Sequence, residues 1–273
     1  MTVGVRPAGG VGGGSWVERL ARPGLAAKGV LYAIIGVLAL MVAVGAGGKT
    51  TDNGGALTTL ADKPFGKALV AILAVGLAGY VAWRLAQAFA DTDDKGDDAS
   101  GLVKRAGKIV GAVAYGILLG VAISILVGSG GSSGSSGGSK QEKQTTAGVL
   151  DWPAGRYLVG IAGLVVIGVG AWNVYRGLSR KFMKRLRVSG PGRPWVERTG
   201  VVGHVARGVV FGLIGVFLVK AAVEFDPKEA VGLDGALARL ADRAYGPVLL
   251  GIVAAGLIAY ALFCFAEARW REV

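Results

Sequence analysis

The sequence predicts an all-α, polytopic membrane protein with six transmembrane helices, arranged as three tandem helical hairpins. The first observation is composition: 52% of the 273 residues are hydrophobic and 18% are charged, against about a quarter charged in soluble domains. The second is that charged residues are absent from long runs such as 109–139 and 244–266. About 20 apolar residues are enough for a helix to cross ~30 Å of hydrocarbon. The third observation is an internal repeat.

The repeat is clearest in the first half of each hairpin. The sequence WVER at 16–19 returns at 195–198, and each copy is followed at the same spacing by a basic residue, a glycine and an aromatic residue. A weaker copy covers 107–120. The three matched aromatic positions are Tyr32, Tyr115 and Phe211.

The second half of each hairpin repeats as well. The pattern Ala-Leu-x-x-Leu-Ala-Asp-x-x-x-Gly occurs at 56–66 and at 236–246, and 151–155 is the middle copy. Repeats that enter the membrane in the same sense can be related by an axis along the membrane normal. The sequence therefore predicts a pseudo-threefold bundle.

The elements follow from the apolar runs and the breaks between them. Short amphipathic segments are expected at 56–62 and 234–244, where apolar residues recur on one helical face. The spanning helices are expected at 25–46, 65–89, 106–127, 154–177, 201–222 and 245–268.

The remaining segments divide the chain. Residues 1–15 are Gly-rich and expected to be disordered, and 128–139 are a flexible Gly/Ser linker. An acidic cytoplasmic loop is expected at 91–101 and a basic cytoplasmic connector at 179–194. The three membrane repeats then occupy 16–90, 102–178 and 195–273.

The basic residues predict the orientation. The net charge is +12, and Lys and Arg concentrate at both ends of the chain and after the second and fourth helices. Because loops rich in Lys and Arg stay in the cytoplasm, both termini are expected there. We therefore expect a multi-pass membrane protein with its N- and C-termini in the cytoplasm. Its basic face contacts anionic lipid headgroups rather than nucleic acid.

Together these repeats resemble a known family. The basic-Gly-Val-x-aromatic start of the odd helices and the Asp-x-x-x-Gly start of the even ones are similar to the bacterial family of domains of unknown function numbered 1206. The resemblance covers about 16–269 and implies an integral membrane protein without implying an activity. The middle repeat departs from it, since Gly111 stands where Lys28 and Arg207 stand in the other copies.

Three aspartates precede the even helices. One interpretation is helix capping, in which each carboxylate accepts a hydrogen bond from an early backbone N–H. The alternative is a ring of carboxylates at the outer mouth of the bundle that attracts cations. The candidate residues are Asp62, Asp151 and Asp242.

Polar residues also recur near the other ends of the even helices. They are expected to snorkel to the interface, or to form an inward-facing network that binds an anionic headgroup or small anion. The network residues are Arg84, Asn173, Arg176 and Glu267. Lys28 and Arg207 are also expected to snorkel. His204, the one histidine, is a candidate proton relay, and a packed histidine is the simpler interpretation.

Two functions stay open. With one cysteine and one histidine, no catalytic residue, cofactor or metal site is expected. Because the charges cluster at the predicted helix ends, the sequence favours a non-enzymatic structural or interaction protein. The alternative is a small transporter or channel with a site at the bundle axis, which a polar cavity reaching the midplane would favour. A protein partner or homo-oligomer is left open.

Overall fold

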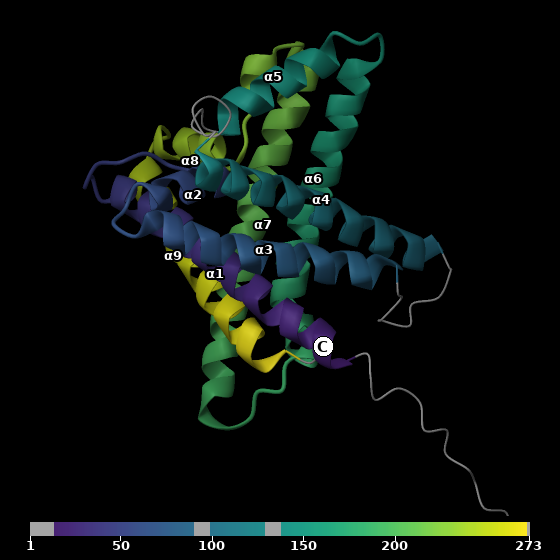
Figure 1. The fold of residues 1–273 in the computed structure, drawn as a ribbon. Helices are drawn as coiled ribbons and strands as arrows, with labels where there is room; N and C mark the ends of the chain where they lie inside the picture. Colours follow the sequence, from purple (N-terminus) through teal and green to yellow (C-terminus); the bar gives the residue numbers. More distant parts are fainter. Residues whose placement is uncertain (1–13, 90–98, 129–137, 272–273) are drawn as a thin grey trace, which may run out of the picture.

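The computed structural model describes residues 14–89, 99–128 and 138–271, which are almost entirely helical (Figure 1). The predicted acidic segment at 91–98 lies outside these residues, and so does most of the Gly/Ser linker. Nine α-helices are described: α1 (Gly14–Ala43), α2 (Asn53–Ala61), α3 (Gly66–Phe89), α4 (Ala99–Val127), α5 (Gly138–Leu150), α6 (Gly155–Leu178), α7 (Arg193–Glu224), α8 (Leu233–Ala241) and α9 (Gly246–Trp270).

Six of these helices are long and apolar enough to cross a membrane, namely α1, α3, α4, α6, α7 and α9. Their outward faces carry large exposed hydrophobic side chains, of which Ile72, Ile117 and Leu164 are examples. Contiguous apolar surface of this kind is stable in lipid and not in water. The predicted all-α, six-span membrane class is confirmed.

Each repeat consists of a spanning helix, a short helix and a second spanning helix. The short helices are α2, α5 and α8, and α5 was not predicted. Each is followed by a tight turn in which a glycine begins the next spanning helix: Gly66, Gly155 and Gly246. A Cβ on any of these glycines would meet the backbone of the preceding short helix. This requirement explains why the Asp-x-x-x-Gly pattern recurs.

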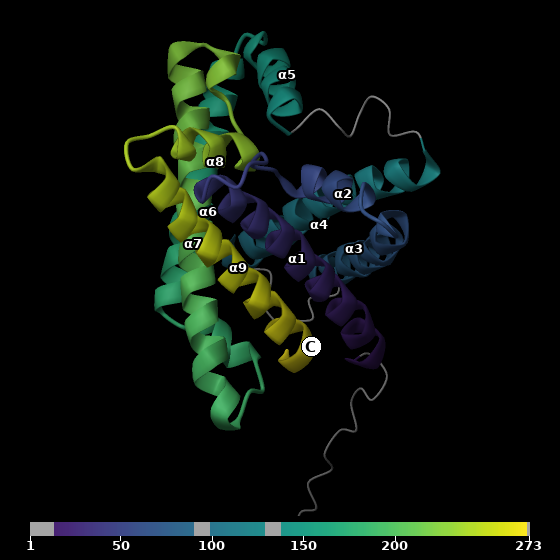
Figure 2. The ribbon, with the colours of Figure 1, turned by 90° about the vertical axis from the view of Figure 1, so that its left-hand side faces the viewer.

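The spanning helices pack in the order α4–α3–α1–α9–α7–α6. In Figure 1 α3 and α4 lie across α6 and α7, with α1 and α9 inclined between them. Figure 2 shows α1 and α9 side by side, with α7 and α3 flanking them. The second helix of each repeat therefore packs against the first helix of the next, and α9 closes back on α1.

The pseudo-threefold arrangement is not confirmed, because the middle hairpin is open. In the described residues α1 packs on α3 and α7 packs on α9, but α4 and α6 form no comparable interface. In the outer repeats Gly24 and Gly203 lie against the backbones of Tyr80 and Tyr260. A Cβ on Gly107, their counterpart in α4, would meet none of the described residues within 4 Å. The close contact that joins the other two hairpins is therefore missing.

The connector after α6 is folded rather than a free basic loop. It contains two short 3-10 helices, η1 (Lys181–Arg185) and η2 (Gly190–Gly192). Phe182 is buried, and the backbone N–H of Arg187 donates to the carbonyl of Trp270 at 2.9 Å. These contacts tie the connector to the end of α9. At the start of the chain, α1 already begins at Gly14, inside the segment expected to be disordered.

Two glycines of α7 test the importance of close helix packing. An alanine Cβ at Gly203 would lie 2.5 Å from the Tyr260 Cα, whereas a Cβ at Gly212 would meet none of the described residues within 4 Å. We expect Gly203→Ala to destabilise the fold by about 1–3 kcal/mol, because α7 and α9 must move apart. Gly212→Ala should be neutral or stabilising by about 0.5–1 kcal/mol. Thermal unfolding in one detergent compares them, and equal midpoints would contradict the packing argument.

Candidate functional site

Lys28 and Arg207 lie halfway along their helices. The helices predicted at 25–46 and 201–222 would place both near helix starts, but α1 begins at Gly14 and α7 at Arg193. Lys28 is 5% exposed and Arg207 is partly buried. The predicted snorkelling is therefore wrong for Lys28, because the helices extend beyond the apolar runs from which their ends were estimated.

Both cations donate to one phenol. Lys28 Nζ and Arg207 Nη1 each lie 2.7 Å from the hydroxyl oxygen of Tyr260, a residue of α9 that is 2% exposed. The Arg207 guanidinium also lies over the rings of Tyr260 and Phe211, 5.1 and 5.0 Å from their centroids. Such cation–π contacts favour a buried cation. Within the described residues, neither cation has a carboxylate at ion-pair distance.

A cavity of about 260 Å³ lies beside Arg207. Six elements contribute to its wall: the spanning helices α1, α6, α7 and α9, and the beginnings of the short helices α2 and α8. Much of the wall is apolar, with Val166, Ile214 and Leu257 as examples. The polar lining residues are Tyr32, Asp52, Asn53 and Arg207.

Two polar atoms of lining residues lack partners. Arg207 Nε and Asn53 Oδ1 are buried and make no hydrogen bond with any of the described residues. Buried polar atoms in proteins are nearly always paired, so two unpaired atoms on residues that line one cavity mark side chains that a bound ligand or water would complete. One is a cationic donor and the other is a neutral acceptor.

Asp52 stands at the α2 side of the cavity. Its Oδ1 accepts a hydrogen bond from the backbone N–H of Gly55 at 2.7 Å and so caps α2. Burial raises the pKa of this carboxyl above its ordinary value, and the nearby charge of Asp234 adds to the rise. The cavity thus has a cation in the spanning region and acidic groups near the short helices.

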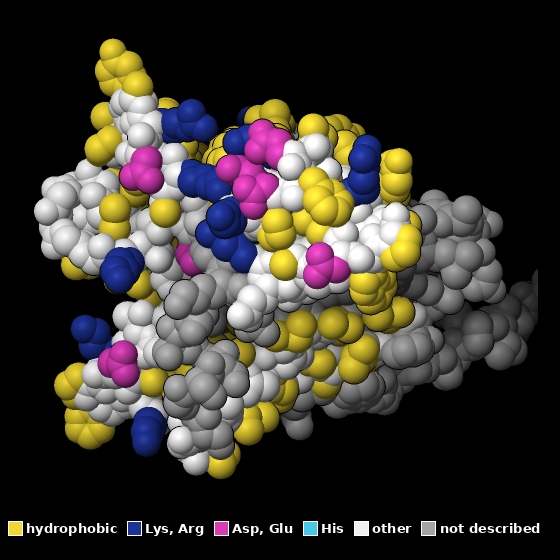
Figure 3. Space-filling view, turned by 90° about the horizontal axis from the view of Figure 1, so that it is seen from above, with side chains coloured by type: hydrophobic (Ala, Val, Ile, Leu, Met, Phe, Trp, Pro, Cys, Tyr) yellow, Lys and Arg dark blue, Asp and Glu magenta, His cyan; other side chains and the backbone are white. Residues whose placement is uncertain are grey.

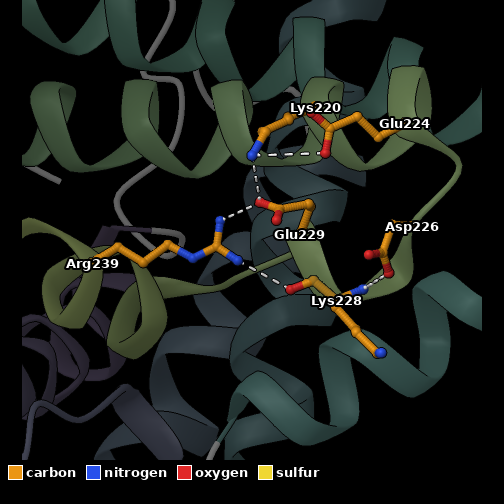
Figure 4. Close-up of polar contacts among 6 residues, drawn as sticks. All are labelled: Lys220, Glu224, Asp226, Lys228, Glu229 and Arg239. Carbon is orange, nitrogen blue, oxygen red and sulfur yellow. Dashed lines mark hydrogen bonds and ion pairs between the residues drawn. The ribbon is translucent and has the colours of Figure 1, made fainter.

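A group of surface charges lies around α8, which contributes Leu233 to the cavity wall. Arg239 donates to Glu229 at 2.6 Å and to the carbonyl of Lys228, and Lys220 lies 3.1 Å from the same carboxylate (Figure 4). These contacts lower the pKa of Glu229. Figure 3, seen from above, shows acidic and basic side chains intermixed on this face. Ion pairs at the surface add little to the free energy of unfolding. Because Arg239 belongs to α8, these contacts instead hold α8 in place against the loop that carries Glu229.

The predicted polar network forms in part. Glu267 is 7% exposed and pairs with Arg271, and the charges of Arg84 and Arg176 lie close enough to interact with it. Asn173 instead donates to the carbonyl of Val169 on its own helix at 2.8 Å. The sequence missed Arg271, although Glu267 and Arg271 have the spacing of a helical ion pair.

The ring of His204 is packed among aromatic side chains. It is 2% exposed, its ring stacks on Phe182 at 5.0 Å, and edges of Tyr260 and Phe263 contact it. Nδ1 donates to the carbonyl of Gly200 at 2.7 Å. This is the environment of a packed histidine, and the proton relay stays a prediction.

The three aspartates end the short helices. Their side chains are exposed, and their backbone N–H groups donate to carbonyls four residues earlier. No side chain caps the start of α6 or α9. In Figure 2 the starts of α3 and α9 lie on opposite sides of the molecule, so the structure does not bring these carboxylates together. The aspartates concerned are Asp62, Asp151 and Asp242.

Comparison with known proteins confirms the repeat and the family resemblance. The profile of the family described as Domain of Unknown Function (DUF1206) matches 24–91, 106–180 and 202–271. Each match begins in the first spanning helix of a repeat and ends just after the second. A relative from Bacillus subtilis (strain 168), described as "Uncharacterized protein YxxB", is 34% identical over 261 residues, covering 94% of this chain and 92% of the relative. No solved structure matches.

The contribution of the Tyr260 hydroxyl to stability can be tested by removing its oxygen atom. Tyr260→Phe leaves the ring but deprives Lys28 and Arg207 of their acceptor, so we expect a loss of stability of about 3 kcal/mol. Tyr157→Phe removes the hydroxyl of a tyrosine that is 62% exposed and should change stability by less than about 0.5 kcal/mol. Unfolding of both variants in detergent is the measurement. Equal stability would show that the two cations do not depend on the phenol.

Two substitutions of Asp52 distinguish the effect of its helix cap on stability from the effect of its buried charge. Asp52→Asn keeps a capping oxygen and removes the buried charge, whereas Asp52→Ala loses the cap and should destabilise by about 1 kcal/mol. Because the folded pKa is raised, wild-type stability falls as the pH rises from the ordinary value of 3.8 through the folded pKa. Asp52→Asn lacks this fall, so its advantage over wild type should grow across that window and then stay constant. Unfolding measured over a pH series tests this, and an Asn variant as unstable as the Ala variant would contradict it.

Proposed function

Since the chain belongs to the family described as Domain of Unknown Function (DUF1206), whose description names no activity, we propose a function from the geometry of the site. The protein is a small transporter that binds its solute in the cavity beside Arg207. The observation that carries this proposal is that the cavity reaches a cation halfway along a spanning helix. Ionisable residues at such depth are costly and are typical of substrate and ion pathways.

The same observation changes the balance between the two functions that the sequence left open. A structural role was favoured because the charges were expected at helix ends. Lys28 and Arg207 instead lie inside the helix array and interact with Tyr260, and the cavity adjoins one of them. A scaffold needs neither a buried cation nor a cavity beside it.

The packing differs on the two sides of the cavity, as expected for a transporter in one state of its cycle. Towards α2 and α8 the cavity is bounded by the beginnings of short helices. Towards the connector, Tyr260, His204, Phe263 and Phe182 pack ring against ring. Opening this aromatic layer while α2 and α8 close over the cavity would expose the site to the other side, as rocking of helix pairs does in known transporters.

The proposal includes an orientation and a location. We place the protein in the bacterial cytoplasmic membrane with both termini in the cytoplasm and α2, α5 and α8 outside, on the distribution of Lys and Arg. The exposed Lys184 and Arg187 of the connector would then face anionic headgroups. The proposed activity is non-enzymatic and uses no cofactor.

An interaction role retains one supporting observation. Only 11% of the spanning window of α4 is buried, the smallest share of the six spans. A partner helix or a second copy of the chain could cover this face in the membrane. The oligomeric state of the reconstituted protein tests this second candidate.

Flux into proteoliposomes tests the transport proposal. We expect the wild-type protein to move at least one solute from a panel of inorganic ions, amino acids and organic acids. Arg207→Gln and Asn53→Ala should reduce that flux by about tenfold or more. Arg243→Gln, which changes an exposed residue away from the cavity, should not. A folded protein that moves none of the panel would contradict transport and leave the structural role.

A further inference from the structure

The two ends of the cavity differ in what they offer a ligand. In the spanning region Arg207 lines the cavity, and its buried Nε–H makes no hydrogen bond within the described part of the chain. Lys28 donates to the same phenol, so two positive charges share a neutral acceptor, and no carboxylate of the described residues lies at ion-pair distance from either. An anionic group on the ligand would satisfy the free donor and offset this charge. A cationic group would be repelled.

The apolar part of the cavity wall calls for an apolar body in the ligand. Val166, Ile214 and Leu257 belong to this part of the wall, and a volume of 260 Å³ corresponds to roughly nine water molecules at ~30 Å³ each. An inorganic ion at Arg207 would leave these side chains against water. A ligand of similar total size with a short hydrocarbon body would cover them, which is favourable in proportion to the apolar area buried.

The short-helix end requires a hydrogen-bond donor. Asn53 Oδ1 is a buried acceptor without a partner, and a hydroxyl or ammonium group would satisfy it. The carboxyls of Asp52 and Asp234 stand close to this end. A second anionic group on the ligand would lie against them, so this end disfavours a dianion.

We propose that the cavity binds a small organic monoanion whose acidic group pairs with Arg207, whose short apolar body fills the middle, and whose far end carries a hydrogen-bond donor for Asn53. This inference rests on the proposed function only for its biological role. The ligand class itself follows from Arg207, Asn53 and the apolar wall, and binding can be measured without transport.

A matched set of six-carbon probes tests each end separately. With the full-length protein in detergent, 6-hydroxyhexanoate and 6-aminohexanoate should bind most tightly, because they carry both the acid and the donor. Hexanoate lacks the donor and should bind several-fold more weakly. Hexylamine, adipate and inorganic phosphate should bind about tenfold more weakly still, or not at all. Titration calorimetry measures the affinities.

Two variants assign the two ends to residues, each measured as the ratio of the affinities of two probes for one protein, and a third tests the apolar wall. Arg207→Gln should abolish the preference for hexanoate over hexylamine. Asn53→Leu should abolish the preference for 6-hydroxyhexanoate over hexanoate while hexanoate still binds. Val166→Phe, which fills the middle of the cavity, should weaken all probes, and Arg243→Gln should weaken none. Asn53→Leu and Val166→Phe keep the test decisive if Arg207→Gln does not fold.

The outcomes separate this inference from transport. Tighter binding of hexylamine, adipate or phosphate than of hexanoate, or no binding of any probe, would overturn the ligand class. Equal binding of hexanoate and 6-hydroxyhexanoate by wild type would overturn the role of Asn53. Binding as expected without flux into liposomes would retain the ligand class and contradict transport. Flux of a cation without binding of the acids would retain transport and contradict the ligand class.

Discussion

The hydroxyl of Tyr260 is the contact on which the centre of this membrane protein depends. It accepts hydrogen bonds from Lys28 of α1 and Arg207 of α7, so one atom of α9 joins three helices. The close approach of α7 is possible because Gly203 lies against the Tyr260 backbone. Without this contact Lys28 and Arg207 would lose their shared acceptor, and the cation beside the cavity would no longer be held by α9.

The same chemistry explains how a threefold repeat in sequence becomes an asymmetric structure. Tyr80 is the counterpart of Tyr260 and accepts a hydrogen bond from Arg84 at 3.0 Å. The Arg84 Nε lies 3.8 Å from where a Cβ on Gly111 would be, so an arginine of α3 occupies the region that a cation at position 111 would need. The middle repeat has Val169 where the others have tyrosine. It therefore lacks both the cation and its acceptor, and its two helices separate.

The candidate site could be predicted only in pieces. Glu267, Arg84 and Arg176 were found because polar residues recur near the same end of each even helix, whereas Arg271, the ion-pair partner of Glu267, was missed. The three aspartates were found as a repeat, but their carboxylates are exposed and lie on separate turns. The cavity residues Asn53 and Val166 gave no signal, since an asparagine beside glycines reads as a turn and a valine in a spanning helix reads as lipid-facing. Their importance arises from helices that are distant in sequence.

The sequence by itself determined the class of the protein, the six spans and the three repeats, because apolar length and repetition are local properties of a chain. It also determined that short helices precede α3 and α9. Only the tertiary structure decided that the middle hairpin opens and that Lys28 and Arg207 are central. Those outcomes depend on which helix brings a tyrosine or a glycine to the opposite side of an interface, and neither the depth of a charge nor its partner is encoded within one helix.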